Sequence, residues 1–312
     1  MEKPVVVETK DLTKVYGDNV AVDHLNLQVR QGEIFGFLGP NGAGKTTTIL
    51  MLLGLTEPTS GTATVAGLTP IREGLKVRRI TGYLPENVGF YEDMTGRENL
   101  AYTASLNGIR YSMAKDRIDN LLDLVGLKER ADHKVDKYSK GMKQRLGIAD
   151  VMIKDPRVVF LDEPTVGIDP DGVQRVLDII LHMSHEQKIT VFLSSHLLYQ
   201  VQRICTRIGI MVKGHLVAEG TIDRLGQEAL GMEGLKVEVQ ATGAPGKLKE
   251  ALARLDGVKR VEPSGELFIV DADKDIRASI SNLVSQQGNS LLHLKLQTHP
   301  LEEIYMKYFH RE

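Results

Sequence analysis

The sequence of 312 residues lacks the features that mark several large classes of protein. It contains a single cysteine, Cys205, so no disulfide can form within the chain, and this suits a reducing compartment. The 39 basic and 41 acidic residues give a formal net charge of −2. A broad basic face is therefore not expected, and neither is a nucleic-acid partner.

No apolar run in the sequence is long enough to cross a membrane. The densest one, ILMLLGL at residues 49–55, is far shorter than the about 20 residues that a spanning helix requires. The amino-terminal stretch MEKPVVVETK has no long apolar core and is not typical of a signal peptide. If the protein serves a membrane, we expect another chain to do the spanning.

The first 220 or so residues alternate short apolar runs with helical patterns. EIFGFLG, RVVFLDE and ITVFLSS are almost free of polar alternation, which is typical of strands buried on both faces of a parallel sheet. VVVETKDLTKVYG and HLNLQVRQGE alternate more strongly and indicate an antiparallel β flank. The fold class predicted for this part of the chain is therefore α/β.

A helical insertion is predicted at about residues 87–155. Thr95 and Glu98 have the spacing of a capping box, and an apolar stripe follows in SMAKDRIDNLLDLVGL. The character of the sequence then changes near residue 222. We expect one domain over residues 1–222 and a second over residues 223–312.

The second domain has a different order of elements. Strand-like and helix-like segments follow one another as β-α-β-β-α-β, which predicts a small α+β domain of the ferredoxin-like type. A final amphipathic helix is expected to begin at Pro300, since proline suits a first helical turn.

A phosphate-binding motif lies between a predicted strand and a predicted helix. The pattern G-x-x-x-x-G-K-[ST] is matched here, and strand–loop–helix is the context that it requires. The loop GPNGAGKTT comprises Gly39, Pro40, Asn41, Gly42, Ala43, Gly44, Lys45, Thr46 and Thr47. Backbone N–H groups would surround the phosphates of a triphosphate, with Lys45 on the β- and γ-phosphates and Mg²⁺ on Thr46.

The partner of such a loop is an apolar strand that ends in aspartate, and RVVFLDEP supplies it. Asp162 is predicted to hold Mg²⁺, directly or through water. Glu163, the next residue, is predicted to polarise the attacking water, although it could also be a solvated residue at a strand end.

At this point the ordered set of motifs resembles a known family. Tyr16, GPNGAGKTT, GYLPEN, YSKGMKQR, VVFLDEP, GIDP and SSH occur in this order, as in the nucleotide-binding subunit of an ABC transporter, over about residues 5–220. The resemblance implies a P-loop NTPase domain of the ABC type that binds ATP and Mg²⁺ and hydrolyses ATP. It implies that Tyr16 stacks on adenine, that His196 contacts the γ-phosphate, and that Asp169 lies in a loop crossing a dimer interface. A strand tyrosine and a structural histidine are the alternatives.

YSKGMKQR occupies the place of the family's signature LSGGQ. The resemblance implies that Ser139 and the N–H of Gly141 bind the γ-phosphate held by the opposite chain, so that a head-to-tail homodimer completes the site. Lys140 and Met142 depart from the signature. Lys140, Lys143 and Arg145 could add positive potential at this helix start, but Lys143 and Arg145 are expected to be solvated helix positions instead.

GYLPEN differs from the family in another way, because Glu86 stands where glutamine is more common. A carboxylate can still ligate Mg²⁺, so Glu86 is included among the expected magnesium ligands. Glu86 in GYLPEN and the YSKGM form of the signature resemble the motifs of exporter-type ATPases that work with a separate membrane subunit. Within them, YLPENVGFYEDMTGRENL and PLEEIYMKYF resemble the ATPase associated with copper-site maturation of nitrous oxide reductase.

These resemblances imply an ATPase motor that is peripheral on the cytoplasmic face of the membrane and drives a transmembrane permease. The alternative is a soluble ABC ATPase that acts on the ribosome or on nucleic acid. Such proteins usually carry two cassettes or a long coiled coil, and this sequence has one phosphate loop and no long heptad run. The second domain could brace the dimer, modulate the ATPase or sense a small ligand.

Overall fold

The computed structural model describes residues 3–230, 235–243, 245–297 and 301–309. The chain divides into two compact units, one up to Thr221 and the other from Ile222 onward. Each unit has its own hydrophobic core.

A six-stranded sheet forms the centre of the first unit, in the order β5-β6-β7-β3-β8-β9. Neighbouring strands are parallel from β5 to β8, and β9 is antiparallel to β8. Every residue of β3, β6 and β7 is buried, as the continuous apolar runs predict. The strands are β3 (Ile34–Leu38), β5 (Thr81–Leu84), β6 (Val158–Asp162), β7 (Thr190–Ser195), β8 (Arg207–Val212) and β9 (His215–Gly220).

A three-stranded antiparallel sheet in the order β2-β1-β4 makes the predicted β flank. Its strands are β1 (Val5–Tyr16), β2 (Asn19–Arg30) and β4 (Ser60–Val65). In β1, Val7 pairs with Val29 on one side and Val65 on the other, and all three are fully buried. Their side chains lie on the face that packs into the core, which explains the alternating pattern of the sequence.

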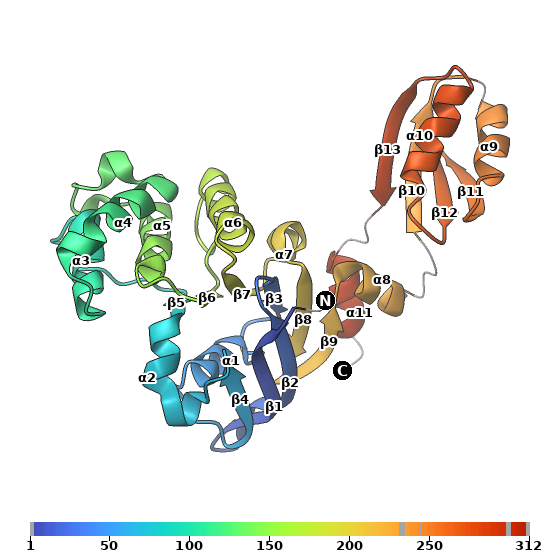
Figure 1. The fold of residues 1–312 in the computed structure, drawn as a ribbon. Coiled ribbons are helices and arrows are strands. Elements are labelled where there is room, and N and C mark those ends of the chain that lie inside the picture. Colours follow the sequence, from blue (N-terminus) through green and yellow to red (C-terminus); the bar gives the residue numbers. More distant parts are fainter. Residues whose placement is uncertain (1–2, 231–234, 244, 298–300, 310–312) are drawn as a thin grey trace. The chain divides into compact units, whose positions relative to one another are not determined.

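One core joins the two sheets. Buried residues of β1, β2 and β4 pack with those of helix α1 (Lys45–Leu52) and with four phenylalanines of the central sheet. Phe192 is at the centre of these rings, with centroids 5.1–5.7 Å from those of Phe35, Phe37 and Phe160. Helix α1 lies on the same side of the six-stranded sheet as the antiparallel sheet, and α6 and α7 lie on the other (Figure 1).

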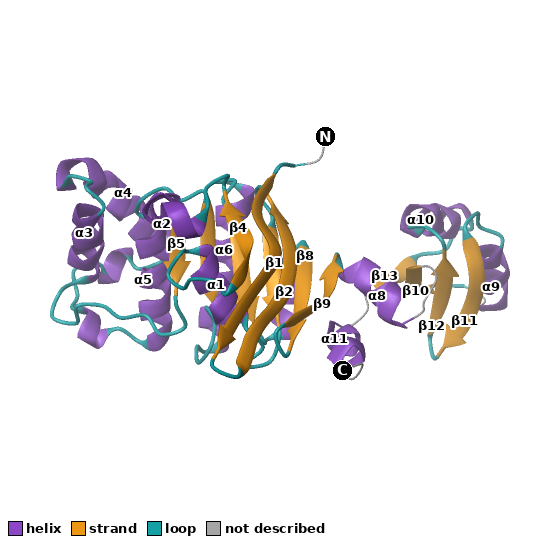
Figure 2. Ribbon diagram, turned by 90° about the horizontal axis from the view of Figure 1, so that it is seen from below, coloured by secondary structure: helices purple, strands orange, loops and turns teal. Residues whose placement is uncertain are grey.

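The helices of the first unit fall into two groups. Helices α2 (Pro70–Ile80), α6 (Pro170–His185) and α7 (Leu198–Ile204) accompany the sheets. The segment between β5 and β6 contains α3 (Gly96–Leu106), α4 (Tyr111–Leu124), α5 (Lys140–Met152) and the 3₁₀ turns Lys128–Arg130 and Val135–Lys137. These helices gather at one end of the unit, beside the strands (Figure 2). Thr95 and Glu98 form the predicted capping box at the start of α3.

The expectation that Arg145 is solvated is wrong. Its side chain is only 7% exposed, and its Nη1 donates to the carbonyl oxygens of Val125 (2.5 Å) and Gly126 (3.1 Å). These carbonyls follow the end of α4 and would otherwise lack partners, so the buried guanidinium serves as their cap. Lys143 is also not freely solvated, because its ammonium pairs with Glu92 at 2.6 Å.

The second unit contains a four-stranded antiparallel sheet in the order β11-β12-β10-β13. Its elements follow the β-α-β-β-α-β order that the sequence predicts. They are β10 (Leu235–Ala241), α9 (Pro245–Ala253), β11 (Val258–Ser264), β12 (Leu267–Ala272), α10 (Arg277–Gln286) and β13 (Leu291–Gln297). Val237, Val239 and Val270 are fully buried in its core.

The second unit has two further helices. Helix α8 (Ile222–Leu230) precedes the strands of this sheet in the sequence, helix α11 (Leu301–Phe309) follows them, and the two helices contact each other. Helix α8 is not among the elements predicted from the sequence. The expected final helix is present as α11, with Leu301 and Ile304 buried, whereas Pro300 lies outside the described residues. Among the described residues, no helix has the length and apolar character that crossing a membrane requires.

Candidate nucleotide site

The phosphate loop leads from the end of β3 to the start of α1. Gly44, the residue before the helix, has a φ of 100°, and no side chain caps the helix. A Cβ at Gly44 would collide with the carbonyl oxygen of Ala21, so glycine is required there for two reasons. The first turn of α1 also has no acidic residue, which leaves its N–H groups and the positive end of its dipole suited to an anion.

Lys45 is held at the base of this loop with 6% of its surface exposed. Its Nζ donates to the carbonyl oxygens of Gly39 (2.7 Å) and Pro40 (3.2 Å) and lies 3.5 Å from Oε1 of Glu163. The ammonium therefore has a fixed position between the loop and the carboxylates that follow β6.

Asp162 is joined to two hydroxyl groups from other elements. Thr46 Oγ1 donates to Asp162 Oδ2 at 2.7 Å, and Ser194 Oγ donates to Oδ1 at 2.6 Å. Burial raises the pKa of the neighbouring Tyr83 to about 12, and the negative charge of Asp162 acts in the same direction. The hydroxyl of Thr46 and the carboxylate of Asp162 are hard oxygen donors, the type that Mg²⁺ takes.

Among the described residues, no three His, Cys, Asp or Glu side chains are grouped so that they could hold a metal by themselves. Glu86, two residues beyond β5, is exposed and lines the same pocket as Thr46 and Asp162.

Glu163 and His196 are brought together because β6 and β7 are parallel neighbours. Asp162 is paired with Ser194, so the next residues of both strands emerge at the same edge of the sheet. His196 Nδ1 lies 3.0 Å from Glu163 Oε2. Glu163 is 6% exposed, and its other oxygen, Oε1, is buried without a hydrogen-bond partner among the described residues. Oε1 lies 3.5 Å from the Lys45 ammonium and keeps lone pairs that no hydrogen bond among the described residues uses, and a general base needs such lone pairs.

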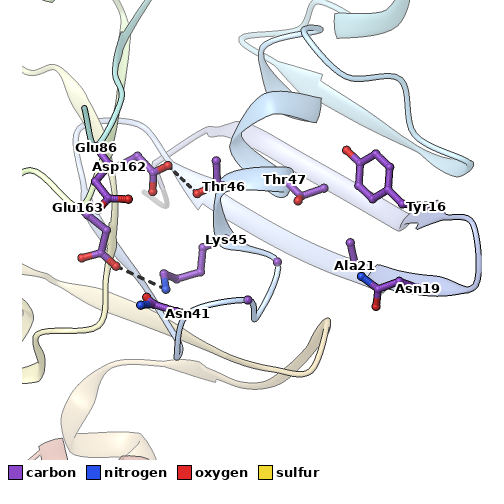
Figure 3. A pocket seen from close by; sticks show the side chains of 12 residues that line it. Tyr16, Asn19, Ala21, Asn41, Lys45, Thr46, Thr47, Glu86, Asp162 and Glu163 are labelled. Atoms are coloured by element: carbon purple, nitrogen blue, oxygen red, sulfur yellow. Dashed lines mark hydrogen bonds and ion pairs between the residues drawn. The ribbon is translucent and has the colours of Figure 1, made fainter. Parts of the chain in front are cut away.

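The pocket that Lys45, Thr46, Asp162 and Glu163 line has a volume of about 380 Å³, and His196 is not one of its lining residues. Glu86, Asp162 and Glu163 lie at one end of it, the phosphate loop lies in the middle, and Tyr16 lies at the other end (Figure 3). The lining residues are Tyr16, Asn19, Ala21, Asn41, Gly42, Gly44, Lys45, Thr46, Thr47, Glu86, Asp162 and Glu163. An aromatic ring at one end and an ammonium beside the phosphate loop are groups that can hold the base and the phosphates of a nucleotide.

Tyr16 is the last residue of β1 and is 48% exposed, with Lys14 Nζ 4.7 Å from its ring centroid. Its ring is therefore available for stacking at the open end of the pocket. Asn19 and Ala21 are not among the residues predicted from the sequence, and they reach the pocket because the β1–β2 hairpin pairs Tyr16 with Asn19. Ser194 was not predicted either, and the polar end of ITVFLSS was the available signal for it.

Several predicted residues do not line the pocket. Gly39, Pro40 and Ala43 contribute to the backbone of the loop, where the Ala43 N–H donates to Pro40. Ser139, Gly141 and Asp169 belong to a separate cluster at the starts of α5 and α6. Ser139 Oγ accepts from the Met142 N–H at 3.3 Å, and Asp169 Oδ1 accepts from the Gly172 N–H at 2.8 Å, so both residues are helix caps.

These two helix starts lie against each other. A Cβ on Gly141 would be 3.0 Å from Ile168 Cγ2 and 4.0 Å from Asp169 Oδ2. A Cβ on Gly167 would collide with the side chain of Lys140, which therefore runs over that glycine. The structure thus places Lys140, the residue that departs from the signature, directly on the loop that precedes Asp169.

Comparison with known proteins places these features in a family context. A family model for ABC transporters matches residues 22–166. The bacitracin transport ATP-binding protein BcrA of Bacillus licheniformis is 44% identical over 220 residues, which are 70% of this chain and 71% of BcrA. The linearmycin resistance ATP-binding protein LnrL of Bacillus subtilis (strain 168) is 31% identical over 310 residues, 96% of this chain and 97% of LnrL.

The solved structures agree with these sequence comparisons. An ATP-binding subunit of an ABC transporter matches with a TM-score of 0.65 and 30% identity, covering 72% of this chain and 92% of the other. A dimeric ATP-binding cassette bound to ADP and phosphate matches in fold, with a TM-score of 0.63, 24% identity, and coverage of 69% of this chain and 98% of that one.

Proposed function

Because this chain belongs to the ATP-binding subunits of ABC transporters and is an ATPase, we propose that it is the motor of an exporter. Two copies would close head to tail around ATP and drive a separate transmembrane permease. The observation that carries the proposal is the convergence of Lys45, Thr46, Asp162 and Glu163 on one pocket. His196 joins them through its contact with Glu163.

The residues of the pocket divide the chemistry among them. The first-turn amides of α1 and the ammonium of Lys45 bind the phosphates and offset their charge. Bound Mg²⁺, held by Thr46 and Asp162 with Glu86 nearby, would neutralise charge that develops on the phosphate oxygens. Glu163 accepts a proton from the attacking water at Oε1, and His196 holds the other carboxylate oxygen in place. Tyr16 stacks on the adenine at the far end.

The cluster at the starts of α5 and α6 supports the dimer. Ser139, Gly141 and Asp169 have the chemistry to contact a γ-phosphate and a neighbouring chain, yet none of them lines the pocket of its own chain. A second copy facing head to tail would bring this cluster to the nucleotide of the first copy. Each chain would then supply two different half-sites.

The helical insertion supports a membrane partner. Five large side chains on it are 40–75% exposed, namely Tyr91, Tyr102, Leu106, Tyr111 and Met113, which we call the insertion patch. Tyr91 and Tyr102 form an edge-to-face pair with centroids 5.0 Å apart, so part of the patch is preorganised. Several large exposed side chains on one segment, two of them in contact, support a role of this segment in binding another protein. We assign the insertion patch to the permease, so that the subunit would lie on the cytoplasmic face of the membrane.

The names of the relatives favour export of an antibiotic-like compound. BcrA is described as a bacitracin transport protein, and LnrL as a linearmycin resistance protein. The LnrL match covers nearly the full length of both proteins, so it includes the second unit. We propose the same class of cargo here, carried by the permease.

Replacing the proposed base tests the catalytic assignment. Glu163→Gln keeps the size of the side chain but cannot accept the proton, so ATP hydrolysis should fall by roughly 10²–10⁴. Because ATP still binds, the variant should accumulate as an ATP-bound dimer in size-exclusion chromatography. Glu186→Gln, an exposed change on the same unit, is the control. Normal hydrolysis by Glu163→Gln would contradict the assignment.

Capture of the membrane partner tests the transporter function. The tagged chain, recovered from its native membranes in mild detergent, should bring a multi-spanning protein with it, identified by mass spectrometry. Leu106→Glu in the insertion patch should abolish this capture without affecting ATP binding. Leu292→Glu is the matched control, because Leu292 is 61% exposed and Leu106 is 70% exposed. Ribosomal or DNA-repair proteins in place of a membrane protein would favour the soluble alternative.

A further inference from the structure

A second cavity, of about 340 Å³, lies between the end of α4, helix α5 and helix α6. None of its lining residues lines the nucleotide pocket. On α6, the lining residues Arg175, Asp178, Ile179 and His182 have the spacing i, i+3, i+4 and i+7, so they share one face of the helix. The facing wall is made by Leu124, Val125, Gly126 and Arg145.

Two guanidinium groups face this cavity, those of Arg145 and Arg175, and neither forms an ion pair with a carboxylate among the described residues. Arg145 is more than nine-tenths buried, and its Nε is buried with no hydrogen-bond partner among the described residues. Arg175 has no ion pair with any carboxylate that the structure describes. Burial lowers the pKa of Arg145, the positive charge of Arg175 acts in the same direction, and the negative charge of Asp169 opposes these two effects without cancelling them. An anion between Arg145 and Arg175 would offset the remaining cost of the buried charge.

The other polar groups of the cavity limit what can bind there. Asp178 carries the one negative charge among its lining residues and accepts a hydrogen bond from Gln174 Nε2 at 2.6 Å. His182 adds a ring nitrogen that can donate. Leu124, Val125 and Ile179 supply apolar wall, and the volume exceeds that of a bare phosphate several times.

We propose that this cavity is a binding site for a small organic anion. A phosphate group would lie between Arg145, Arg175 and His182, and an apolar body would pack on Leu124, Val125 and Ile179. Guanidinium groups suit this head group because their fixed N–H donors match its oxygen atoms.

The location gives such binding a route to the ATPase. The ligand would bridge α5 and α6, whose caps are Ser139 and Asp169, so we expect it to change the rate of hydrolysis. This consequence rests on the proposed function, whereas the binding itself does not. The experiment therefore measures binding directly, on a chain whose phosphate loop is already filled.

Phenyl phosphate is the probe, titrated by isothermal calorimetry into the full chain saturated with ADP. We expect one site per chain and weaker binding of inorganic phosphate, which lacks the apolar body. Arg175→Gln should weaken binding of phenyl phosphate by about tenfold or more, the effect of one charge-assisted hydrogen bond. Asp178→Asn removes a repelling charge at constant size and should strengthen binding a few-fold.

Arg72→Gln, an exposed change on α2, is the matched control and should leave the affinity unchanged. Equal affinity of the wild type and Arg175→Gln would overturn the site. So would an equal loss in Arg72→Gln, since binding would then follow net charge alone. Equal affinity for inorganic phosphate and phenyl phosphate would overturn the assignment of the apolar wall.

Discussion

Glu163 combines a strained backbone with a buried carboxylate. Its φ is 49°, a value that residues other than glycine adopt rarely, and it directly follows the last residue of β6. The Glu163 N–H donates to the carbonyl oxygen of Ser194, which fixes this turn against β7. The strain is therefore held by the sheet, and it aims Oε1 at Lys45 and Oε2 at His196.

Two glycines of the phosphate loop allow a matched test at the residue scale. Gly44→Ala places a methyl group against the Ala21 carbonyl at a φ of 100°. Gly42→Ala meets only the unfavourable φ of 83°, because nothing lies within 4 Å of its Cβ position. Positive φ alone costs about 1–2 kcal/mol for alanine, and overpacking adds about 1–3 kcal/mol.

Urea unfolding without nucleotide should therefore show a larger loss of stability for Gly44→Ala than for Gly42→Ala. Equal losses would mean that the loop can shift away from Ala21, and the close approach would then not explain the glycine.

Helix α5 has a cap that the proposed dimer uses a second time. Ser139 accepts a hydrogen bond from the helix and is also the side chain assigned to the opposite γ-phosphate. Lys140 follows it, and no acidic residue lies in the first turn, so this end of the helix remains positive. Helix N-termini usually favour acidic side chains. A basic first turn here is consistent with an anion that arrives from another chain.

Ser139→Ala tests the double use of this cap at the element scale. We expect impaired ATP hydrolysis but unchanged binding of ATP to the monomer, because Ser139 is absent from the pocket of its own chain. Thr95→Ala, which removes the cap of α3, controls for the loss of about 1 kcal/mol of helix stability. Loss of monomer binding in Ser139→Ala alone would contradict the in-trans assignment.

The whole molecule divides its tasks between two units with separate cores. All residues that line the nucleotide pocket belong to the unit that ends at Thr221. The second unit supplies none of them, so its contribution to the motor would be indirect. Bracing the dimer and adjusting its rate are the roles that this division leaves open to it.

A chain that ends at Thr221 tests this division. It should fold and bind ATP as a monomer with unchanged affinity, because the core and the pocket of the first unit are complete. If the second unit braces the dimer, sedimentation of the Glu163→Gln background with ATP should show weaker dimerisation, or the wild-type background should show an altered ATPase rate. Unchanged behaviour in both measurements would remove that role.

Much of the fold and of the nucleotide site could be predicted because the signals are local. Buried parallel strands appear as short apolar runs, and the phosphate loop is one continuous stretch between a strand and a helix. The sequence of RVVFLDEP likewise determined that Asp162 and Glu163 end a buried strand. Each of these features depends on neighbours within a few residues, which periodicity and backbone chemistry describe well.

Tertiary structure alone decided which distant residues meet. The order of strands in the sheet brings Ser194 to Asp162 and His196 to Glu163, and the hairpin brings Asn19 to Tyr16. It also determined that Arg145, which a helical pattern leaves at an exposed position, is buried beside the end of α4 and faces Arg175. A sequence pattern fixes which side of a helix is polar, but the environment of that side depends on which element packs against it.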